Sequence, residues 1–206
     1  MILVQEARLQ ERGVLPKMLK RLFLILMLSL IFLHMAEALE IKGPYLAFKD
    51  SVIRVSFQLD LDSDYVDEIR KGISKEVIFY IDLFRLWKTW PDEFIVGRKI
   101  VRKIRSDPMK KEYIATSFNG DTLIEKRFNS FESMMKWALN FDDSYLTSLK
   151  GMPSGTYFVR TTVESRLRNI PSLFSEIFFF LPDREFKVSS DSGLFRWNES
   201  SLEPLR

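Results

Sequence analysis

The chain of 206 residues contains no cysteine and a single histidine, His34. The absence of cysteine excludes disulfides, thiolate metal ligands, cysteine nucleophiles and a lipid-modified cysteine. His34 lies in a segment that we expect to be removed, so the rest of the chain also lacks the imidazole that Ser-His-Asp and Cys-His mechanisms need. Enzymatic chemistry would then depend on carboxylate pairs, lysine or tyrosine. We expect no cofactor and no metal.

The composition is that of an ordinary globular protein. Hydrophobic residues make up 46% of the chain, which is enough for a sizeable core, and the length favours one domain over two. The formal net charge of +3 indicates no particular partner by itself. The distribution of the charges is more informative than their sum.

A hydrophobic run near the amino end predicts export. Lys20 and Arg21 precede the twelve-residue run 22–33, and an A-x-A cleavage pattern follows and ends at Ala38. A membrane span needs about 20 residues, so this run fits a signal peptide better than a membrane helix. We therefore expect cleavage after Ala38 and a periplasmic domain, with retention by an uncleaved N-terminal anchor as the alternative.

Three segments follow from this assignment. Residues 1–38 would comprise an over-extended amino terminus, with Met18 as the expected true start, and the signal peptide. Residues 39–197 are expected to form a single globular domain, and residues 198–206 a frayed tail. Cleavage would remove five basic and three acidic residues, leaving 26 basic against 25 acidic residues and a net charge of +1.

The run EVIFYIDLFRLWKTW, residues 76–90, predicts the central strand. Both of its alternating sides are apolar, so we expect both faces to be covered. Its β-branched and aromatic residues favour a strand over a buried helix, and Pro91 would end it. Asp82 and Arg85 lie within this run and should be paired, or lie at its exposed end, because an unpaired buried charge is strongly destabilising.

Alternation and turn residues predict the other strands. These cover residues 53–61, 113–118, 122–128 and 157–164, with a last strand that begins at residue 186. Asn119-Gly120 predicts a hairpin with a type I′ turn between two of them. Residues 142–155 have no such pattern and are predicted to form a loop.

Two segments have the periodicity of short amphipathic helices. The first covers about 64–71, with Ser63 or Asp64 as its cap. The second is capped by Asn129. Its predicted buried face consists of Phe131, Met134, Met135, Ala138 and Leu139. Residues 171–178 can form a third helix or a strand.

Together the elements predict an α+β fold. It is a mainly antiparallel, sandwich-like β-sheet with two or three short amphipathic helices packed on it, preceded by an N-terminal signal helix.

An acidic cluster resembles the start of a calcium-binding loop: Asp60, Asp62, Asp64, Asp67 and Glu68. Such a loop needs glycine at its sixth position and glutamate at its twelfth, where this chain has tyrosine and lysine. Acidic residues are favoured at a helix N terminus in any case, so we expect a structural role and no metal.

Seven basic residues fall within fourteen positions: Arg98, Lys99, Arg102, Lys103, Arg105, Lys110 and Lys111. We call this set the basic ribbon and expect most of it on a strand that turns at residues 106–108. A solvated sheet face or a charged edge is the structural explanation. The functional explanation is a docking surface for an acidic partner protein or for anionic lipid head groups. Nucleic acid is not expected as a partner of an exported domain.

Several residues lie in an order that is familiar from one protein family. In sequence order they are Gly72-Ile73, Trp87, Trp90, Arg98, Tyr113, the 131–139 helix, Tyr157, Arg160, Leu167, Ile170-Pro171, Phe186 to Ser189 and Trp197. In these features, over nearly all of the mature chain, the sequence resembles a bacterial family of exported proteins classified only as domain of unknown function number 4390. Family members usually have Leu-Pro and Trp where this chain has Ile170-Pro171 and Phe186. The resemblance implies an envelope location and genes that are often near those of membrane sensor kinases, but no activity, cofactor or catalytic residue.

Three functions remain open from the sequence. The first is a non-catalytic interaction or sensory-accessory module of the bacterial envelope, whose protein partner at the membrane would be a protein such as a sensor kinase. The second is a carrier or sensor of an apolar or lipid ligand, with phenylalanines lining a cavity. The third is a hydrolase with two carboxylates about 5 to 9.5 Å apart, although no such pair stands out. Arg160 is the one polar residue singled out individually, as the partner of an acidic ligand or, preferably, of a structural carboxylate such as Asp82.

Overall fold

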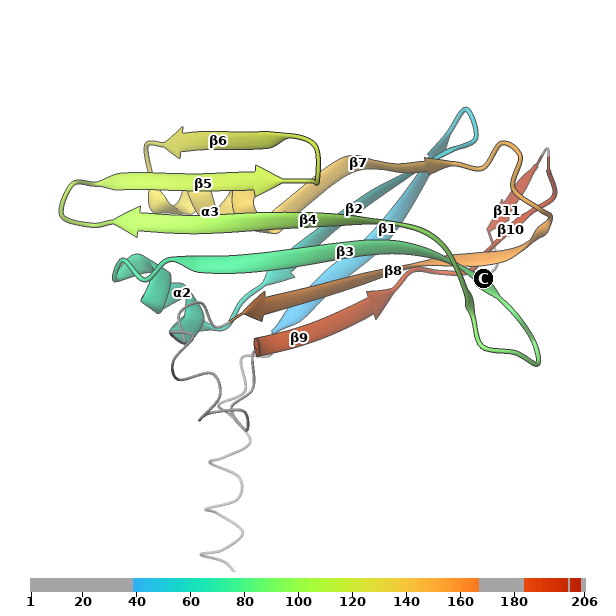
Figure 1. Cartoon of the computed structure of the whole chain (residues 1–206), viewed down its shortest axis with the longest axis horizontal. Coiled ribbons are helices and arrows are strands. Elements are labelled where there is room, and N and C mark those ends of the chain that lie inside the picture. Colours follow the sequence, from blue (N-terminus) through green and yellow to red (C-terminus); the bar gives the residue numbers. More distant parts are fainter. Residues whose placement is uncertain (1–38, 167–183, 200, 205–206) are drawn as a thin grey trace, which may run out of the picture. The chain divides into compact units, whose positions relative to one another are not determined.

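The computed structural model describes residues 39–166, 184–199 and 201–204, which belong to one compact unit (Figure 1). The expected signal peptide and the segment 171–178 lie outside the described residues. Within the described ranges, no helix is both long and apolar enough to cross a membrane.

Two antiparallel sheets form most of the described domain. The small sheet has the order β1-β2-β7, with β1 (Glu40–Lys49), β2 (Val52–Asp60) and β7 (Asn140–Ser148). The large sheet has eight strands in the order β11-β10-β8-β3-β4-β5-β6, and β9 also pairs with β8. Its strands are β3 (Lys75–Leu86), β4 (Glu93–Asp107), β5 (Glu112–Phe118), β6 (Leu123–Phe128), β8 (Gly155–Arg166), β9 (Arg184–Asp191), β10 (Phe195–Trp197) and β11 (Leu202–Pro204). The helices are α2 (Ser63–Arg70) and α3 (Phe131–Leu139).

The core lies between the large sheet and a second layer made of the small sheet and α3. Figure 1 shows the small sheet crossing β3 and β8 obliquely, with α3 beside β4 and β5. The ring of Phe57 on β2 lies 6.0 Å from that of Phe79 on β3, and Phe141 on β7 lies within 4.8 Å of both. The α+β, mainly antiparallel and sandwich-like fold predicted from the sequence is confirmed.

Strand β3 is central, as predicted, because β4 pairs with one edge and β8 with the other. Val77, Phe79 and Leu83 on its inner face are fully buried. The opposite face is only partly covered, since Ile78 is buried while Phe84 is half-buried. The strand ends at Leu86, earlier than the run of aromatic residues predicted, and Trp90 is 75% exposed.

Both predicted helices form, but each begins at a different cap. The side chain of Asp62 accepts a hydrogen bond from the backbone N–H of Tyr65 at the start of α2. Ser130 accepts from the N–H of Ser133 at the start of α3. The predicted caps, Ser63 or Asp64 and Asn129, are therefore wrong. The predicted buried face of α3 is confirmed at all of its positions, Phe131, Met134, Met135, Ala138 and Leu139.

The hairpin between β5 and β6 is confirmed, but its turn is longer than predicted. Phe118 pairs with Leu123, so the loop has four residues and not two. The side chain of Asn119 accepts hydrogen bonds from the N–H groups of Asp121 and Thr122. Gly120 has a φ of 101°, a conformation that glycine adopts most readily.

Two segments that the sequence left irregular are strands. Residues Asn140–Ser148, predicted as a loop, form β7 and pair with β2. Leu146 on β7 and Leu149, which follows it, are buried. The end of the chain was predicted to be frayed after residue 197, but Leu202–Pro204 pairs with β10 as β11.

Candidate functional site: the outer face of the large sheet

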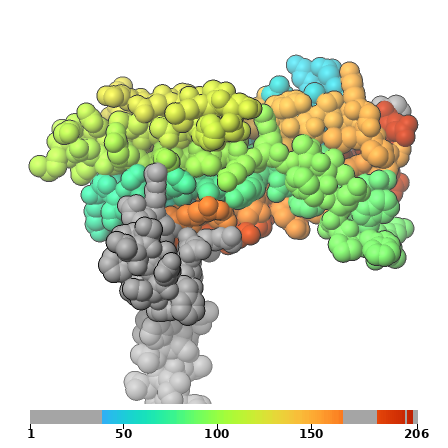
Figure 2. All heavy atoms as spheres, viewed as in Figure 1, coloured from blue at the N-terminus to red at the C-terminus, as the bar shows by residue number. Residues whose placement is uncertain are grey.

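The candidate site is the face of the large sheet that points away from the core. Side chains alternate along each strand, so the burial of Phe79 and Leu83 places Tyr80, Asp82 and Phe84 on the outer face. The strand register puts Lys99 of β4 beside Tyr80 and extends this face to the neighbouring strands. Figure 2 shows the surface that β3 to β6 form.

The basic ribbon is not one surface, because β4 directs its side chains to both faces. Arg98 and Arg102 point inward with Ile104, which is fully buried. Five residues remain outside the core, on β4 and in the following turn: Lys99, Lys103, Arg105, Lys110 and Lys111. We call these five the outer basic face.

Arg102 is buried and lies among aromatic rings. Its guanidinium carbon is 3.6 Å from the centroid of Phe141 and 4.9 Å from that of Trp137. Its Nη1 donates to the backbone carbonyls of Trp137 at 2.6 Å and Asn140 at 3.1 Å, at the C terminus of α3. A cation is favoured at that end of a helix. Burial lowers the pKa of Arg102 to about 10. This arginine therefore joins β4 to the α3–β7 junction and takes no part in a docking surface.

Arg98 also has a structural contact. It donates to the carbonyl of Tyr145 at 2.6 Å, and its guanidinium lies 5.4 Å from the centroid of the Tyr145 ring. It therefore bridges from β4 to β7.

The residues of the outer basic face have few acidic partners. Lys103 lies 3.7 Å from the carboxylate of Glu76, and the amine of Lys110 lies 3.8 Å from that of Asp107. Arg105 and Lys111 are exposed and have no carboxylate partner among the described residues. The face therefore presents cations that remain available to an acidic surface.

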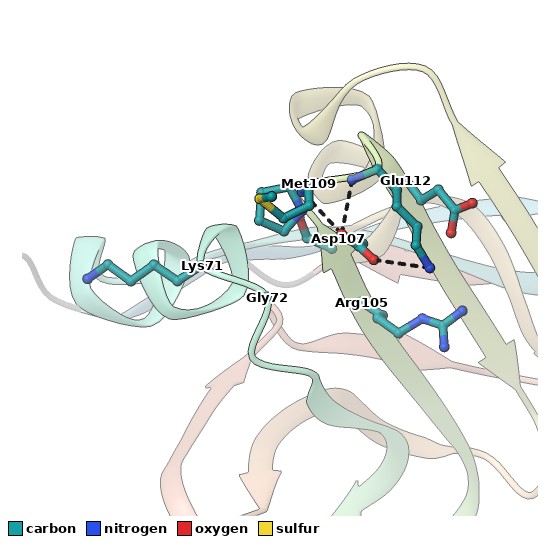
Figure 3. A pocket seen from close by; sticks show the side chains of 9 residues that line it. Lys71, Gly72, Arg105, Asp107, Met109 and Glu112 are labelled. Atoms are coloured by element: carbon teal, nitrogen blue, oxygen red, sulfur yellow. Dashed lines mark hydrogen bonds and ion pairs between the residues drawn. The ribbon is translucent and has the colours of Figure 1, made fainter.

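A recess of about 480 Å³ lies at the β4–β5 turn, beside the end of α2 (Figure 3). Asp107 closes the turn by accepting hydrogen bonds from the N–H groups of Met109 and Lys110 at 3.1 Å. The side chains of Lys71 and Arg105 point away from each other, and the amine of Lys110 lies 3.8 Å from the carboxylate of Asp107. The recess therefore contributes positive surface and is not a built anion site.

A second recess, of about 410 Å³, lies on the outer face over strands β3 to β6. It is lined by Glu76, Val101, Lys103, Thr116, Phe118 and Leu123. Leu123 is 68% exposed. An apolar floor with one lysine at its edge adds contact area beside the outer basic face.

Arg160 lies on β8, and its carboxylate partner is Asp191 of β9, not Asp82. Its Nε and Nη2 donate to the two carboxylate oxygens of Asp191, each at 2.7 Å. Asp82 is the cross-strand neighbour of Arg160, but no hydrogen bond joins the two side chains in the described part of the chain. The structural role expected for Arg160 is thus supported with a different partner.

Asp82 is half-buried, and no donor among the described residues hydrogen-bonds its carboxylate. Burial raises the pKa of Asp82, while the charge of Arg160 lowers it, and the net change is upward. Gly97 lies opposite on β4, and a Cβ atom there would come 2.0 Å from Asp82 Oδ1. The carboxylate therefore occupies space that only glycine leaves open.

Sequence reasoning missed a buried polar cluster between α2, β3, β8 and β9. Lys75 forms ion pairs with Glu185 and, at 2.5 Å, with Glu68. Ser165 donates to Glu185 at 2.7 Å and shares a hydrogen bond of 2.7 Å with the hydroxyl of Tyr65. Burial lowers the pKa of Lys75, but the hydrogen bonds to both glutamates raise it by more than burial lowers it. The net change of the pKa is therefore upward. The lysine directly before the apolar run of β3 was the available signal. Because Ser165 is fully buried, the cluster is structural and not a nucleophile site.

The acidic cluster near α2 has structural roles instead of a shared ligand. Asp62 caps α2, Asp60 pairs with Lys42, and Glu68 pairs with Lys75. No metal-ligand group of three His, Cys, Asp or Glu residues is found in the described ranges.

The described residues define a mainly antiparallel, sandwich-like α+β domain whose outer face carries exposed cations. The model of one family, described as a domain of unknown function (DUF4390), matches residues 43–193. The chain belongs to this family. No curated protein and no solved structure matches the chain.

Proposed function

We propose that the chain is an exported, non-catalytic interaction module of the bacterial envelope, which docks through the outer basic face on an acidic membrane protein such as a sensor kinase. The observation behind this proposal is the orientation of Lys99, Lys103 and Arg105, which point outward from one face of β4, with Val101 between the two lysines. Such a row steers an anionic partner and fixes its register along the strand.

The packing of the core supports a role in protein interaction and not a role in carrying an apolar ligand. Phe57, Phe79 and Phe141 pack against one another at centroid distances of 4.6 to 6.0 Å, and the rings of Phe57 and Phe141 are stacked. A carrier of an apolar ligand would need such rings to line a cavity. A non-catalytic role is further supported by the absence of cysteine from the chain and of histidine after residue 34.

Charge reversal of the outer basic face tests the proposal. The triple variant Lys99→Glu, Arg105→Glu and Lys111→Glu should lose co-sedimentation with bacterial membranes, and binding of the wild type should weaken as salt rises. The control reverses three exposed lysines elsewhere, Lys49→Glu, Lys136→Glu and Lys150→Glu, and should bind as the wild type does.

Two further arms separate the partners. Binding that is lost when membranes are treated with protease identifies a protein partner. Binding that persists on phosphatidylcholine vesicles only when they contain phosphatidylglycerol identifies anionic lipid instead. Equal binding of the triple variant and the wild type would refute the docking role of this face.

A further inference from the structure

The β3–β4 hairpin lies at the end of the large sheet away from the β4–β5 turn (Figure 1), and large apolar side chains are exposed there. Trp90 is 75% exposed, Phe94 58% and Trp87 41%. Tryptophan is enriched among the residues that contribute most to protein interfaces, because it buries a large area with few rotatable bonds. This end of the sheet is therefore a second contact surface, separate from the outer basic face.

The exposed rings continue into the outer face of the sheet. Phe94 packs edge-on against Phe84 at 5.9 Å, and Phe84 stacks on Phe158 at 5.5 Å. The guanidinium of Arg160 lies 5.4 Å from the centroids of both Phe84 and Phe158. The aromatic row thus already accommodates one guanidinium at its inner end, while its outer end at Phe94 is open.

Asp82 lies beside the open end of this row. A Cβ atom on Gly97 would meet both Asp82 Oδ1 at 2.0 Å and the ring of Phe94 at 3.1 Å, so the carboxylate and the ring border the same small space. The carboxylate has no hydrogen-bond donor from the described residues. A cation that packs on the exposed ring of Phe94 would therefore lie beside an unpaired carboxylate and contact both groups.

The cations nearest to Asp82 have other contacts. Arg160 is paired with Asp191, and Arg85 donates to the carbonyl of Ser154. Lys99 lies two residues from Gly97 on the same face, and its amine lies 5.8 Å from the centroid of the Tyr80 ring. None of these described side chains donates a hydrogen bond to Asp82, so its carboxylate favours a basic group of a partner.

We propose that Asp82, Gly97 and Phe94 form a seat for an arginine or lysine side chain of a partner polypeptide, with Trp87 and Trp90 covering the flanking residues of that segment. A polypeptide fits better than a free amine, because an amine could contact Asp82 and Phe94 but would leave both indoles in water. This inference does not depend on the outer basic face, which would select a partner of the opposite charge.

Titration of the full chain with a defined peptide tests the seat. The probe is an acetylated pentapeptide of alternating leucine and arginine, followed by tryptophan fluorescence, because Trp87 and Trp90 lie at the surface concerned. The same peptide with citrulline in place of arginine keeps the shape and removes the charge, and should bind about fivefold more weakly.

Two variants perturb the seat in different ways. Asp82→Asn removes the charge, and Gly97→Ala keeps every charge but displaces the carboxylate and the Phe94 ring. Each variant should bind the arginine peptide about fivefold more weakly than the wild type does. Glu125→Gln, which neutralises an exposed carboxylate on β6, should leave binding unchanged. Urea unfolding of each variant distinguishes loss of the seat from loss of the fold.

Four outcomes would overturn the proposal. These are equal binding of the arginine and citrulline peptides, equal binding of the wild type and both seat variants, binding of arginine methyl ester as tight as that of the peptide, or no binding of the peptide at all.

Discussion

Substitution of Arg102 tests how the large sheet is joined to the layer formed by the small sheet and α3. Replacing it with methionine keeps an apolar stem of similar length and removes the guanidinium. The wild-type side chain donates to two backbone carbonyls and lies 3.6 Å from the centroid of Phe141. Hydrogen bonds to a charged group contribute about 1.5 kcal/mol each at the low end, and a desolvated cation–π contact contributes about 2 kcal/mol.

The cost of burying Arg102 opposes these contributions. Burial lowers its pKa to about 10, and the change from the ordinary value corresponds to about 3 kcal/mol. The favourable contacts amount to about 5 kcal/mol, so we expect Arg102→Met to lower the free energy of unfolding by about 2 kcal/mol. Arg102→Lys should fall between the two, because an ammonium keeps the charge and can donate to the carbonyls but lacks the planar face that lies over the Phe141 ring.

Urea unfolding followed by tryptophan fluorescence measures this difference. The control is Arg105→Met, an exposed position on the same strand, which should change the unfolding free energy by less than about 0.5 kcal/mol. An Arg102→Met variant as stable as the wild type would show that the desolvation cost cancels the contacts and would refute this account of the α3–β7 junction.

Three further changes test other parts of the fold. Asp82→Asn should be more stable than the wild type at pH 7, because the raised pKa of Asp82 means that folding disfavours its charged form. The difference in stability should vanish below about pH 3.8, where the carboxyl is protonated in both the folded and the unfolded state. Urea unfolding at several pH values measures this dependence. Lys75→Met leaves the carboxylate of Glu185 without its buried cation and should cost about 3 kcal/mol, part of which the added change Glu185→Gln restores in the same assay. Phe79→Ala empties the centre of the aromatic core and should cost about 4 kcal/mol, measured as a lower Tm by calorimetry.

The spacing of apolar residues predicted those helices and strands whose two faces differ clearly in polarity or are both apolar. The alternation in β2 and the 3.6-residue stripe in α3 each correspond to one buried face, so their sequences determined the element and its orientation. Strand β7 was missed because its backbone is irregular. Asp143 has a φ of 48° at a shift in register with β2, and the ion pair with Arg54 at 2.9 Å holds it there. A bulge of this kind breaks the alternation on which the prediction depends.

The candidate site shows the same limit. The basic ribbon was counted along the chain, although the spacing of Ile100, Arg102 and Ile104 already placed one arginine on an apolar face of a strand. That signal could have separated Arg102 from the outer basic face. The partner of Arg160 could not be found in this way, because it requires β9 to lie beside β8, and strand order depends on contacts distant in sequence.

The pairing of β8 determines when part of the core can close during synthesis of the chain. One edge of β8 is shared between β9 and the short strand β10, whose Phe195 and Trp197 are almost fully buried. The ring of Phe195 lies 5.0 Å from that of Phe48 on β1, near the opposite end of the described chain. The part of the core that Phe195 and Trp197 cover therefore stays open to water until β10 has been synthesised and has paired with β8. A truncation after Gly193, at the end of the residues that the family model matches, would leave that part of the core open permanently.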